Sequence, residues 1–179
     1  MRVDYPDPPL GDHTLQLREW ELGDVPCIQA ASADPRIGRG TTVPSTHDHG
    51  EAVAFIERQW SRQPAGEGIS LAVVEQGTAI GLVHLGSRPQ PAVLGLGYWL
   101  VPAARGRGLG AHAVRLISDW ALRDTEAERI EAWVEPDNPA SAATLTRVGY
   151  VHEGLLRNFL VLGGERSDVL VYSKLRRDA

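Results

Sequence analysis

The amino-acid sequence predicts a single domain of mixed α/β class, and three observations support this. The chain has 179 residues, of which 42% are hydrophobic and 23% charged, so it contains enough apolar material for one compact core. Stretches with strand character alternate along the chain with stretches that have helical periodicity. A glycine-rich segment, residues 105–111, falls where a predicted strand passes into a predicted helix.

The first part of the chain is predicted to hold an arm, a strand and a short helix. Residues 1–13 are expected to form an N-terminal arm, because three prolines and a glycine among them do not sustain regular structure. The domain is expected to span residues 14–179. Apolar residues at a period close to two indicate a first strand within residues 15–20. Asp24, with a proline two residues later, predicts a short helix that runs to about Ala33.

A second helix is predicted after residue 44. Ser45 or Thr46 is expected to cap it, and Pro64 and Gly66 are expected to end it. The apolar residues that recur in it at helical spacing are Ala52, Val53, Ile56 and Trp60. Charged side chains occupy many of the other positions, which favours an amphipathic helix.

Beyond residue 67 the pattern changes to one of strands. Two apolar runs, residues 71–74 and 80–83, flank a turn that contains glycine and predict a hairpin. Asn138 followed by Pro139 indicates a helix start, with a capping side chain and a proline at the first helical position. The further elements expected are a buried strand at 93–101, a helix at 108–123, a strand at 129–135, a helix from Asn138 to Gly149, and strands at 153–162 and 168–175 joined by a turn at Gly163 and Gly164.

The composition disfavours several classes of protein. A formal net charge of -5 and a pI near 5.7 argue against a general binder of nucleic acid or of acidic membranes. The single cysteine, Cys27, forms no internal disulfide, and residues 1–13 lack the apolar run of a signal peptide. No stretch approaches the roughly 18 uninterrupted apolar residues of a membrane-spanning helix. We therefore expect a soluble, cytoplasmic protein.

Residues 105–111 are predicted to bind an anion. Their glycines, Gly106, Gly108 and Gly110, allow consecutive backbone N–H groups to converge at a helix N-terminus, where the helix dipole adds about half a positive charge. Arg105 and Arg107 add mobile positive charge beside these N–H groups, which suits a diphosphate better than a single carboxylate. The alternative is a glycine-rich helix entry that serves only close packing.

The same segment also satisfies the dinucleotide fingerprint G-x-G-x-x-A through Gly106, Gly108 and Ala111, so a nucleotide-dependent oxidoreductase has to be weighed. Three features argue against it. Helices and a hairpin precede the segment, whereas the fingerprint belongs to a first βαβ unit. The acidic residue at the end of the next strand, Glu135, lies about 30 residues beyond Gly106 instead of about 20. A second βαβ half is also missing.

These residues resemble the Gcn5-related N-acetyltransferases (GNAT). The signature of that family is Arg or Gln, two residues, Gly, one residue, and Gly or Ala, and residues 105–110 match it. The order of the predicted elements over residues 15–175 also resembles the family. The wider sequence resembles the ribosomal-protein alanine N-acetyltransferase subgroup on the residues around the loop, which are Gly97, Tyr98, Trp99, Leu100, Val134, Glu135, Pro136, Asp137, Asn138, Ser141, Gly149, Tyr150, Glu153, Gly154, Asp168 and Tyr172.

The resemblance implies one GNAT domain with a mixed, mostly antiparallel sheet of about seven strands and about four helices. Two parallel strands would splay and form a cleft for acetyl-CoA. The reaction implied is direct transfer of the acetyl group to an amine in a ternary complex, with CoA as product and no metal. The cofactor-binding residues implied are Leu100, Val101, Arg105, Gly106, Arg107, Gly108, Leu109, Gly110, Ala111, Asn138 and Ser141.

Three positions are candidates for catalysis. The resemblance makes the backbone N–H near Leu100 or Val101 the donor to the oxyanion, and Ser141 the acid that protonates the departing thiolate. For Asn138 and Ser141 the alternatives are plain helix capping and an ordinary first-turn serine. Glu135 is a candidate base, although a solvated or arginine-paired carboxylate is the commoner state. An α-amine, with a pKa of about 7.7 to 8.0, needs no strong base.

The acceptor is predicted only as an amine, on a protein N-terminus or a small molecule. Trp99 and Trp133 lie on the two cleft strands and are the first aromatic residues expected to contact it, although core packing is the usual role of such residues. His47 and His49 are not expected to hold a metal, because side chains two residues apart near a helix start point away from each other. A homodimer is expected from the habit of the family. A non-catalytic acyl-CoA sensor stays open as the alternative, because no firm base is found.

Overall fold

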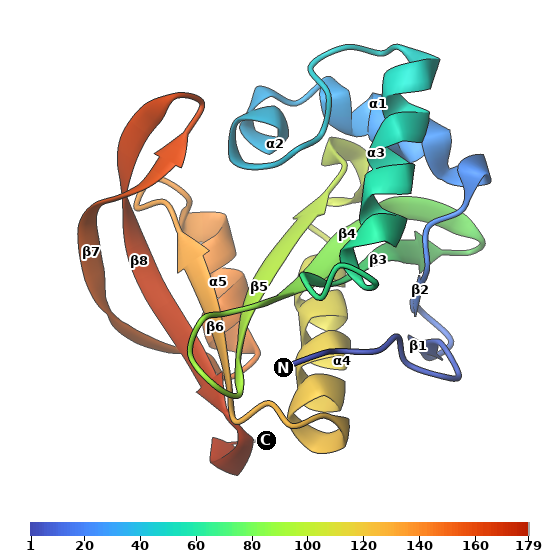
Figure 1. Ribbon diagram of the computed structural model, residues 1–179. Coiled ribbons are helices and arrows are strands. Elements are labelled where there is room, and N and C mark those ends of the chain that lie inside the picture. The colour runs from blue at the N-terminus through green and yellow to red at the C-terminus, as the bar shows by residue number, and fades with distance from the viewer. Residues whose placement is uncertain (179) are drawn as a thin grey trace.

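The structure is a computed structural model that describes residues 1–178, and within them it contains an eight-stranded sheet and five α-helices (Figure 1). The strands are β1 (Leu10–Gly11), β2 (Gln16–Arg18), β3 (Gly68–Glu75), β4 (Thr78–Ser87), β5 (Val93–Leu100), β6 (Arg129–Val134), β7 (Val151–Leu162) and β8 (Glu165–Leu175). The helices are α1 (Val25–Ser32), α2 (Pro35–Gly40), α3 (His49–Arg62), α4 (Leu109–Asp124) and α5 (Pro139–Arg147), with short 3-10 turns η1 (Leu22–Asp24), η2 (Pro102–Ala104) and η3 (Arg176–Asp178).

The sheet is mixed, and its two central strands diverge. The strand order is β1-β2-β3-β4-β5-β6-β8-β7, and only β5 and β6 run parallel among the neighbouring pairs of the described residues. Their pairing ends at Leu96 opposite Ala132. Beyond that point β5 stays paired with β4 as far as Leu100, whereas β6 stays paired with β8 as far as Val134. An opening therefore forms between the carboxyl ends of β5 and β6.

Helices cover both faces of the sheet. α1 and α3 lie against β3 and β4 on one face, and α4 and α5 lie on the opposite face (Figure 1). Side chains along β5 alternate between the two faces, as in any strand. Trp99 points to the α3 face, where its ring centre lies 6.3 Å from that of Trp20. Tyr98 and Leu100 point to the α4 face, next to Gly110.

The hydrophobic core continues through the sheet into both helix layers. On the α3 face, Trp20 packs edge-on against Phe55 with ring centres 6.0 Å apart. On the α4 face, Ile117 and Leu122 are buried against the sheet. Because β5 is sandwiched between these two layers, its position in the fold is fixed by packing from both sides.

Most of the predicted elements are confirmed. The α/β class is confirmed, and the sheet has eight strands instead of about seven, with five helices instead of about four. α2 was not predicted, although Asp34 and Pro35 give it the same start signal as α5; Asp34 Oδ1 accepts a hydrogen bond of 2.9 Å from the Arg36 N–H. β1 forms within the segment predicted as an arm, where Val3 is also buried. None of the helices in residues 1–178 has the length and apolar character needed to cross a membrane.

The start of α3 corrects a prediction. The N-cap is Asp48, not Ser45 or Thr46, and its Oδ1 accepts a hydrogen bond of 2.8 Å from the Glu51 N–H. The Thr46 hydroxyl instead donates to the Glu51 carboxylate. The helix therefore begins later than the sequence suggested, because an aspartate is as good a cap as a serine and stands closer to the apolar stripe.

We expect Asp48→Ala to lower the free energy of unfolding by about 1 kcal/mol, because it removes the acceptor for a free N–H of α3. Ser45→Ala is the matched control and should change stability by less than about 0.3 kcal/mol. Urea denaturation of both variants measures the difference. Equal destabilisation by the two substitutions would contradict the assignment of the cap.

Candidate functional site

The backbone of β5 presents one N–H group to the opening between β5 and β6. Val101 donates its N–H to the Ile80 carbonyl at 2.9 Å, on the β4 side. Since hydrogen-bonding directions alternate along an antiparallel pair, the N–H of Leu100 points the other way, past the last residue paired with β6. The carbonyl of Val101 is also occupied, because it accepts from the Ala104 N–H at 3.0 Å. The sequence left two candidates for the free N–H donor, Leu100 and Val101, and in the structure only the Leu100 N–H faces the opening.

A loop with an exposed row of N–H groups follows β5 directly. Gly106 and Gly108 have φ values of 76° and 79°, which other residues rarely adopt. A Cβ placed on either glycine would meet no atom within 4 Å, so the space above the loop is open. Gly108 is the N-cap of α4, a helix of 16 residues whose first N–H groups have no partner within the helix. The loop thus has the geometry of an anion site.

The two arginines of the loop are held by carboxylates of the protein. Arg105 donates from Nε to the Leu100 carbonyl at 2.9 Å, and its Nη1 lies 2.7 Å from Asp34 Oδ2. Arg107 is paired with Glu75. Their side chains are still 43% and 50% exposed. The sequence predicted mobile charges here, whereas Arg105 also fastens the end of β5 to the N-terminus of α2.

The start of α5 faces the same opening. Asn138 Oδ1 accepts a hydrogen bond of 3.1 Å from the Ser141 N–H and caps the helix. The Ser141 hydroxyl lies 2.8 Å from the hydroxyl of Tyr98. Burial raises the pKa of Tyr98, so this phenol is neutral at physiological pH.

Tyr98 borders the opening, although the sequence named it only as part of the family resemblance and not among the candidate site residues. The signal that could have identified it is its spacing of two from Leu100 on the same strand. Two residues at this spacing point to the same face of the sheet, so Tyr98 had to share the α4 face with Leu100 and the helix starts.

Glu135 follows β6 at the opening, and its carboxylate forms an ion pair with Arg39. Its carboxylate lies 3.3 Å from Arg39 Nη2, and Arg39 also donates to the Ser167 hydroxyl at 3.3 Å. Arg39 is at the end of α2, so this pair ties the end of β6 to α2. The arginine-paired state that the sequence offered as the alternative for Glu135 is the one observed.

The two candidate tryptophans have different surroundings. Trp99 is only 7% exposed and packs against the buried Trp20 in the core. Trp133 lies on the α3 face of β6, where the guanidinium of Arg88 covers its ring at 3.6 Å and the ring of Phe159 meets it edge-on at 4.9 Å. Of the two, Trp133 is accessible to a ligand and Trp99 forms part of the core.

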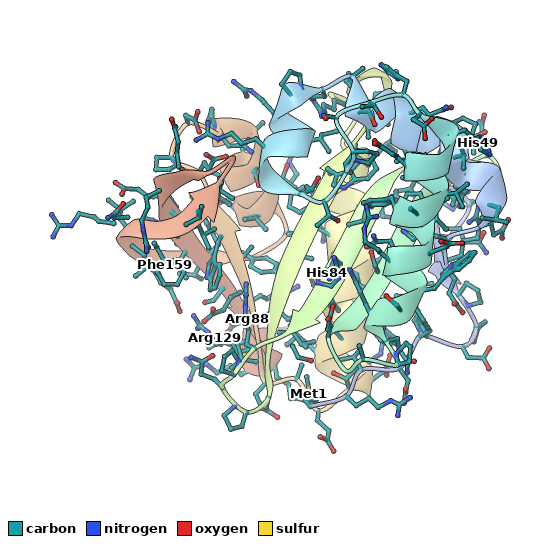
Figure 2. The ribbon with its side chains drawn as sticks, turned by 45° about the horizontal axis from the view of Figure 1, so that its top comes forward. Met1, His49, His84, Arg88, Arg129 and Phe159 are labelled. Carbon is teal, nitrogen blue, oxygen red and sulfur yellow. The ribbon has the colours of Figure 1, made fainter. Side chains whose placement is uncertain are left out.

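Trp133 lines an open hollow of about 730 Å³ on the α3 face of the sheet. Figure 2 labels Arg88 and Arg129 toward the lower end of the sheet and Phe159 on the strand that forms the outer wall. The residues that line the hollow are Arg88, Pro89, Gln90, Glu131, Trp133, Glu153, Gly154, Leu155, Leu156, Phe159 and Val171. The hollow and the loop at residues 105–111 therefore lie on either side of the divergent strands.

The carboxylates of the hollow are already paired. Arg129 donates from Nε to Glu131 at 2.8 Å and from Nη1 to Glu153 at 2.9 Å, and the Ser173 hydroxyl donates to Glu153 at 2.7 Å. The hydrogen bonds from Arg129 and Ser173 lower the pKa of Glu153 to about 2. Both carboxylates are thus neutralised by Arg129 and are poor candidates for a general base.

Two histidines lie near β5, His84 on β4 opposite Gly97 and His112 on α4. His112, in the first turn of α4, lies 2.7 Å from Asp12 through Nε2. Burial lowers the pKa of His84 to about 4, so the ring is neutral at physiological pH. In the part of the chain that the structure describes, no group of three or more His, Cys, Asp or Glu residues is arranged to hold a metal ion.

Comparison with known proteins assigns a family to this arrangement. Residues 14–151 match the family described as "Acetyltransferase (GNAT) domain". The chain is 28% identical over 167 residues to the uncharacterized N-acetyltransferase p20 of Bacillus licheniformis, with 92% of this chain and 94% of the relative covered. It is 29% identical to the putative ribosomal N-acetyltransferase YdaF of Bacillus subtilis, with 66% of each covered. RimJ of Mycobacterium smegmatis, solved in complex with CoA-disulfide, has a similar fold, with a TM-score of 0.82, 22% identity, and 96% of this chain and 90% of that chain covered.

The low pKa of Glu153 makes a prediction about stability at acid pH. A carboxyl whose pKa is lowered by folding contributes stability above its unfolded pKa, near 4.5, and loses that contribution as the pH falls to about 2. Glu153→Gln should therefore be less stable than the wild type at pH 6, and the difference should shrink steadily between pH 4.5 and 2. Urea denaturation at a series of pH values measures this, and a difference that does not depend on pH would refute the ion pair.

Proposed function

The chain belongs to the GNAT acetyltransferases, and on that premise we propose that it transfers an acetyl group from acetyl-CoA to an amine by direct attack within a ternary complex. The observation that carries this proposal is the Leu100 N–H, which points into the opening between β5 and β6 directly before the anion-binding loop. The named N-acetyltransferase relatives support acetyl transfer, and the CoA-disulfide bound to the Mycobacterium smegmatis protein supports CoA as the carrier.

The proposed site for acetyl-CoA runs along the edge of β5. The pyrophosphate would accept hydrogen bonds from the N–H groups of residues 106–111, with Arg107 as the mobile charge. The residues proposed to bind the whole acetyl-CoA molecule are Leu100, Arg105, Gly106, Arg107, Gly108, Leu109, Gly110, Ala111, Asn138 and Ser141. Val101 is left out, because both of its backbone groups are occupied. Arg105 contributes through its charge and by holding the Leu100 carbonyl.

Two groups are proposed to act in the reaction. The Leu100 N–H would stabilise the oxyanion that develops when the amine attacks the thioester carbon. The Ser141 hydroxyl would give its proton to the thiolate as the carbon–sulfur bond breaks. Tyr98, 2.8 Å away, would orient that hydroxyl and pass to it, through solvent, the proton that the attacking nitrogen releases, so that both hydroxyls end the cycle protonated. Glu135 is left out of the mechanism because Arg39 holds it. A neutral α-amine attacks without a strong base, since its pKa is about 7.7 to 8.0.

Two classes of amine are candidates for the acceptor of the acetyl group. A protein N-terminus is proposed first, because one relative is named as a ribosomal N-acetyltransferase. A small amine is the second candidate. The homodimer and the cytoplasmic location stay predictions.

The proposal is tested in two steps. Acetyl-CoA should raise the melting temperature of the protein, whereas NADH and NADPH should not, because binding to the native state alone stabilises it. Free CoA should then appear when peptides or small amines are added. Stabilisation without CoA release from any amine would favour the acyl-CoA sensor, and stabilisation by the nicotinamide nucleotide alone would favour the oxidoreductase.

We expect Arg107→Ala to weaken acetyl-CoA binding about tenfold, because it removes one charge-assisted hydrogen bond to the pyrophosphate. Glu75→Gln is the matched variant, since it frees Arg107 from its carboxylate partner without removing the positive charge. It should leave binding unchanged or strengthen it. Isothermal titration calorimetry measures both, and weaker binding by Glu75→Gln than by Arg107→Ala would contradict the phosphate role.

Replacement of the proposed acid gives a separate prediction. Ser141→Ala should lower kcat about 100-fold and raise the Kd for acetyl-CoA by a much smaller factor, because the main loss is proton transfer to the thiolate. Thr146→Ala, on the exposed side of the same helix, is the control and should leave kcat unchanged. Steady-state release of CoA provides the measurement. An unchanged kcat for Ser141→Ala would show that another group, or water, protonates the thiolate.

A further inference from the structure

The α3 face of β5 has two positions without side chains. Gly95 and Gly97 both point to this face, between β4 and β6. A Cβ on Gly97 would meet no atom within 4 Å, so the surface above it is open. A Cβ on Gly95 would instead collide with the guanidinium of Arg88, which occupies the space that this glycine leaves. We call this strip of β5 without side chains the trough: the Arg88 guanidinium occupies it at Gly95, it is open at Gly97, and it leads along the strand toward Leu100.

Arg88 is a half-buried cation without an anionic partner. Its guanidinium lies between Gly95 and the Trp133 ring, at 3.6 Å from the ring centre. None of the ion pairs within residues 1–178 includes Arg88, and its Nε is buried without a hydrogen-bond acceptor. Burial lowers the pKa of this side chain, which reflects the cost of keeping the charge there.

Two carboxylates lie near Arg88, and the charge of Glu131 favours the protonated guanidinium, but Arg129 binds both carboxylates directly. Glu131, opposite Gly95 on β6, is bound by Arg129 Nε at 2.8 Å, and Glu153 is bound by Arg129 and Ser173. An unpaired, partly desolvated guanidinium gains more from an incoming carboxylate than an exposed one does, because little hydration remains to be lost. The exposed apolar side chains of Leu155, Leu156 and Phe159 line the same hollow as Arg88 and offer a peptide apolar contact surface.

We propose that the hollow and the trough bind the acceptor as an extended polypeptide N-terminus, with an acidic side chain of that polypeptide on Arg88. This inference rests on the proposed function, because it places the acceptor amine at the Leu100 end of the trough. It assigns Arg88 as a specificity-determining residue and names the acceptor class as a polypeptide with an acid a few residues from its amine.

The length of the trough sets the position of that acid. Gly95 and Leu100 are five residues apart on one strand, which corresponds to about 16 Å. The amine stands about 3 Å from the thioester carbon, and the carboxylate stands about 3 Å from the guanidinium. This leaves roughly 10 to 14 Å between amine and carboxylate, which an extended peptide spans with its fourth or fifth residue. A free amino acid is too short to reach both ends, and a polyamine carries no anion.

A panel of peptides tests the inference. The panel consists of otherwise neutral heptapeptides with a free N-terminus. Each peptide carries one Asp, placed at a different position from the second to the sixth. The kcat/KM for CoA release with each peptide is compared with that of the peptide without Asp. We expect about a tenfold preference for Asp at position four or five, mainly through KM, and little preference elsewhere.

Substitution of Arg88 identifies the source of the preference. In Arg88→Gln the ratio between the Asp peptide and the neutral peptide should fall to about one, and in Arg88→Glu a Lys at the same position should become the better residue. Arg115→Gln removes the same charge from the exposed side of α4 and should keep the wild-type ratio. A ratio that survives in Arg88→Gln, an equal loss in Arg115→Gln, or a small amine that outperforms every peptide would overturn the inference.

Failure of the proposed function has a different signature. If no amine releases CoA although acetyl-CoA stabilises the protein, the proposed transfer is wrong. Fluorescence anisotropy with labelled peptides then still tests the hollow. The peptide with Asp at position four or five should bind about tenfold more tightly to the wild type than to Arg88→Gln, and equal affinity would refute the role of Arg88.

Discussion

The two central strands of the sheet stop pairing before either strand ends, and the candidate site depends on this divergence. β5 and β6 pair only as far as Leu96 and Ala132, because β5 then follows β4 and β6 follows β8. The divergence leaves the Leu100 N–H without a strand partner at a place where the sheet is covered by helices. A backbone N–H without a hydrogen-bond acceptor in such a place lowers the stability of the fold. A ligand that supplies an acceptor atom removes this cost, so the position favours ligand binding.

α2 connects the two sides of this opening. Asp34, at its start, holds Arg105 beyond the end of β5, and Arg39, near its end, holds Glu135 beyond the end of β6. Arg105 also binds the Leu100 carbonyl, so the same side chain touches the loop, the strand end and α2. The ends of β5 and β6 are thereby joined through a short helix and a few charged contacts. This arrangement explains why arginines with apparently free charge in the sequence are engaged in the structure.

Local signals in the sequence predicted most of the fold and the position of the loop. Asn138 before Pro139 marked α5 correctly, and the glycines at 106 and 108 marked the turn into α4, because each acts through its own backbone conformation. Contacts between distant residues were not predictable in this way. The pairing of Arg105 with Asp34, the hydroxyl contact of Tyr98 with Ser141, and the occupied N–H of Val101 all depend on register and helix placement. Asp34 before Pro35 is a local signal of the same kind and marks the start of α2, which was not among the predicted elements.

Acetyl-CoA is proposed to bind in the opening with its thioester at the Leu100 N–H. Two-dimensional amide NMR during a titration with CoA thioester tests it most directly, because each backbone N–H is observed separately. We expect large shifts for the Leu100 N–H and for the N–H groups of residues 106–111, and little change for the Val101 N–H, which is bonded to Ile80. Shifts confined to the hollow around Trp133, with Leu100 unaffected, would contradict it.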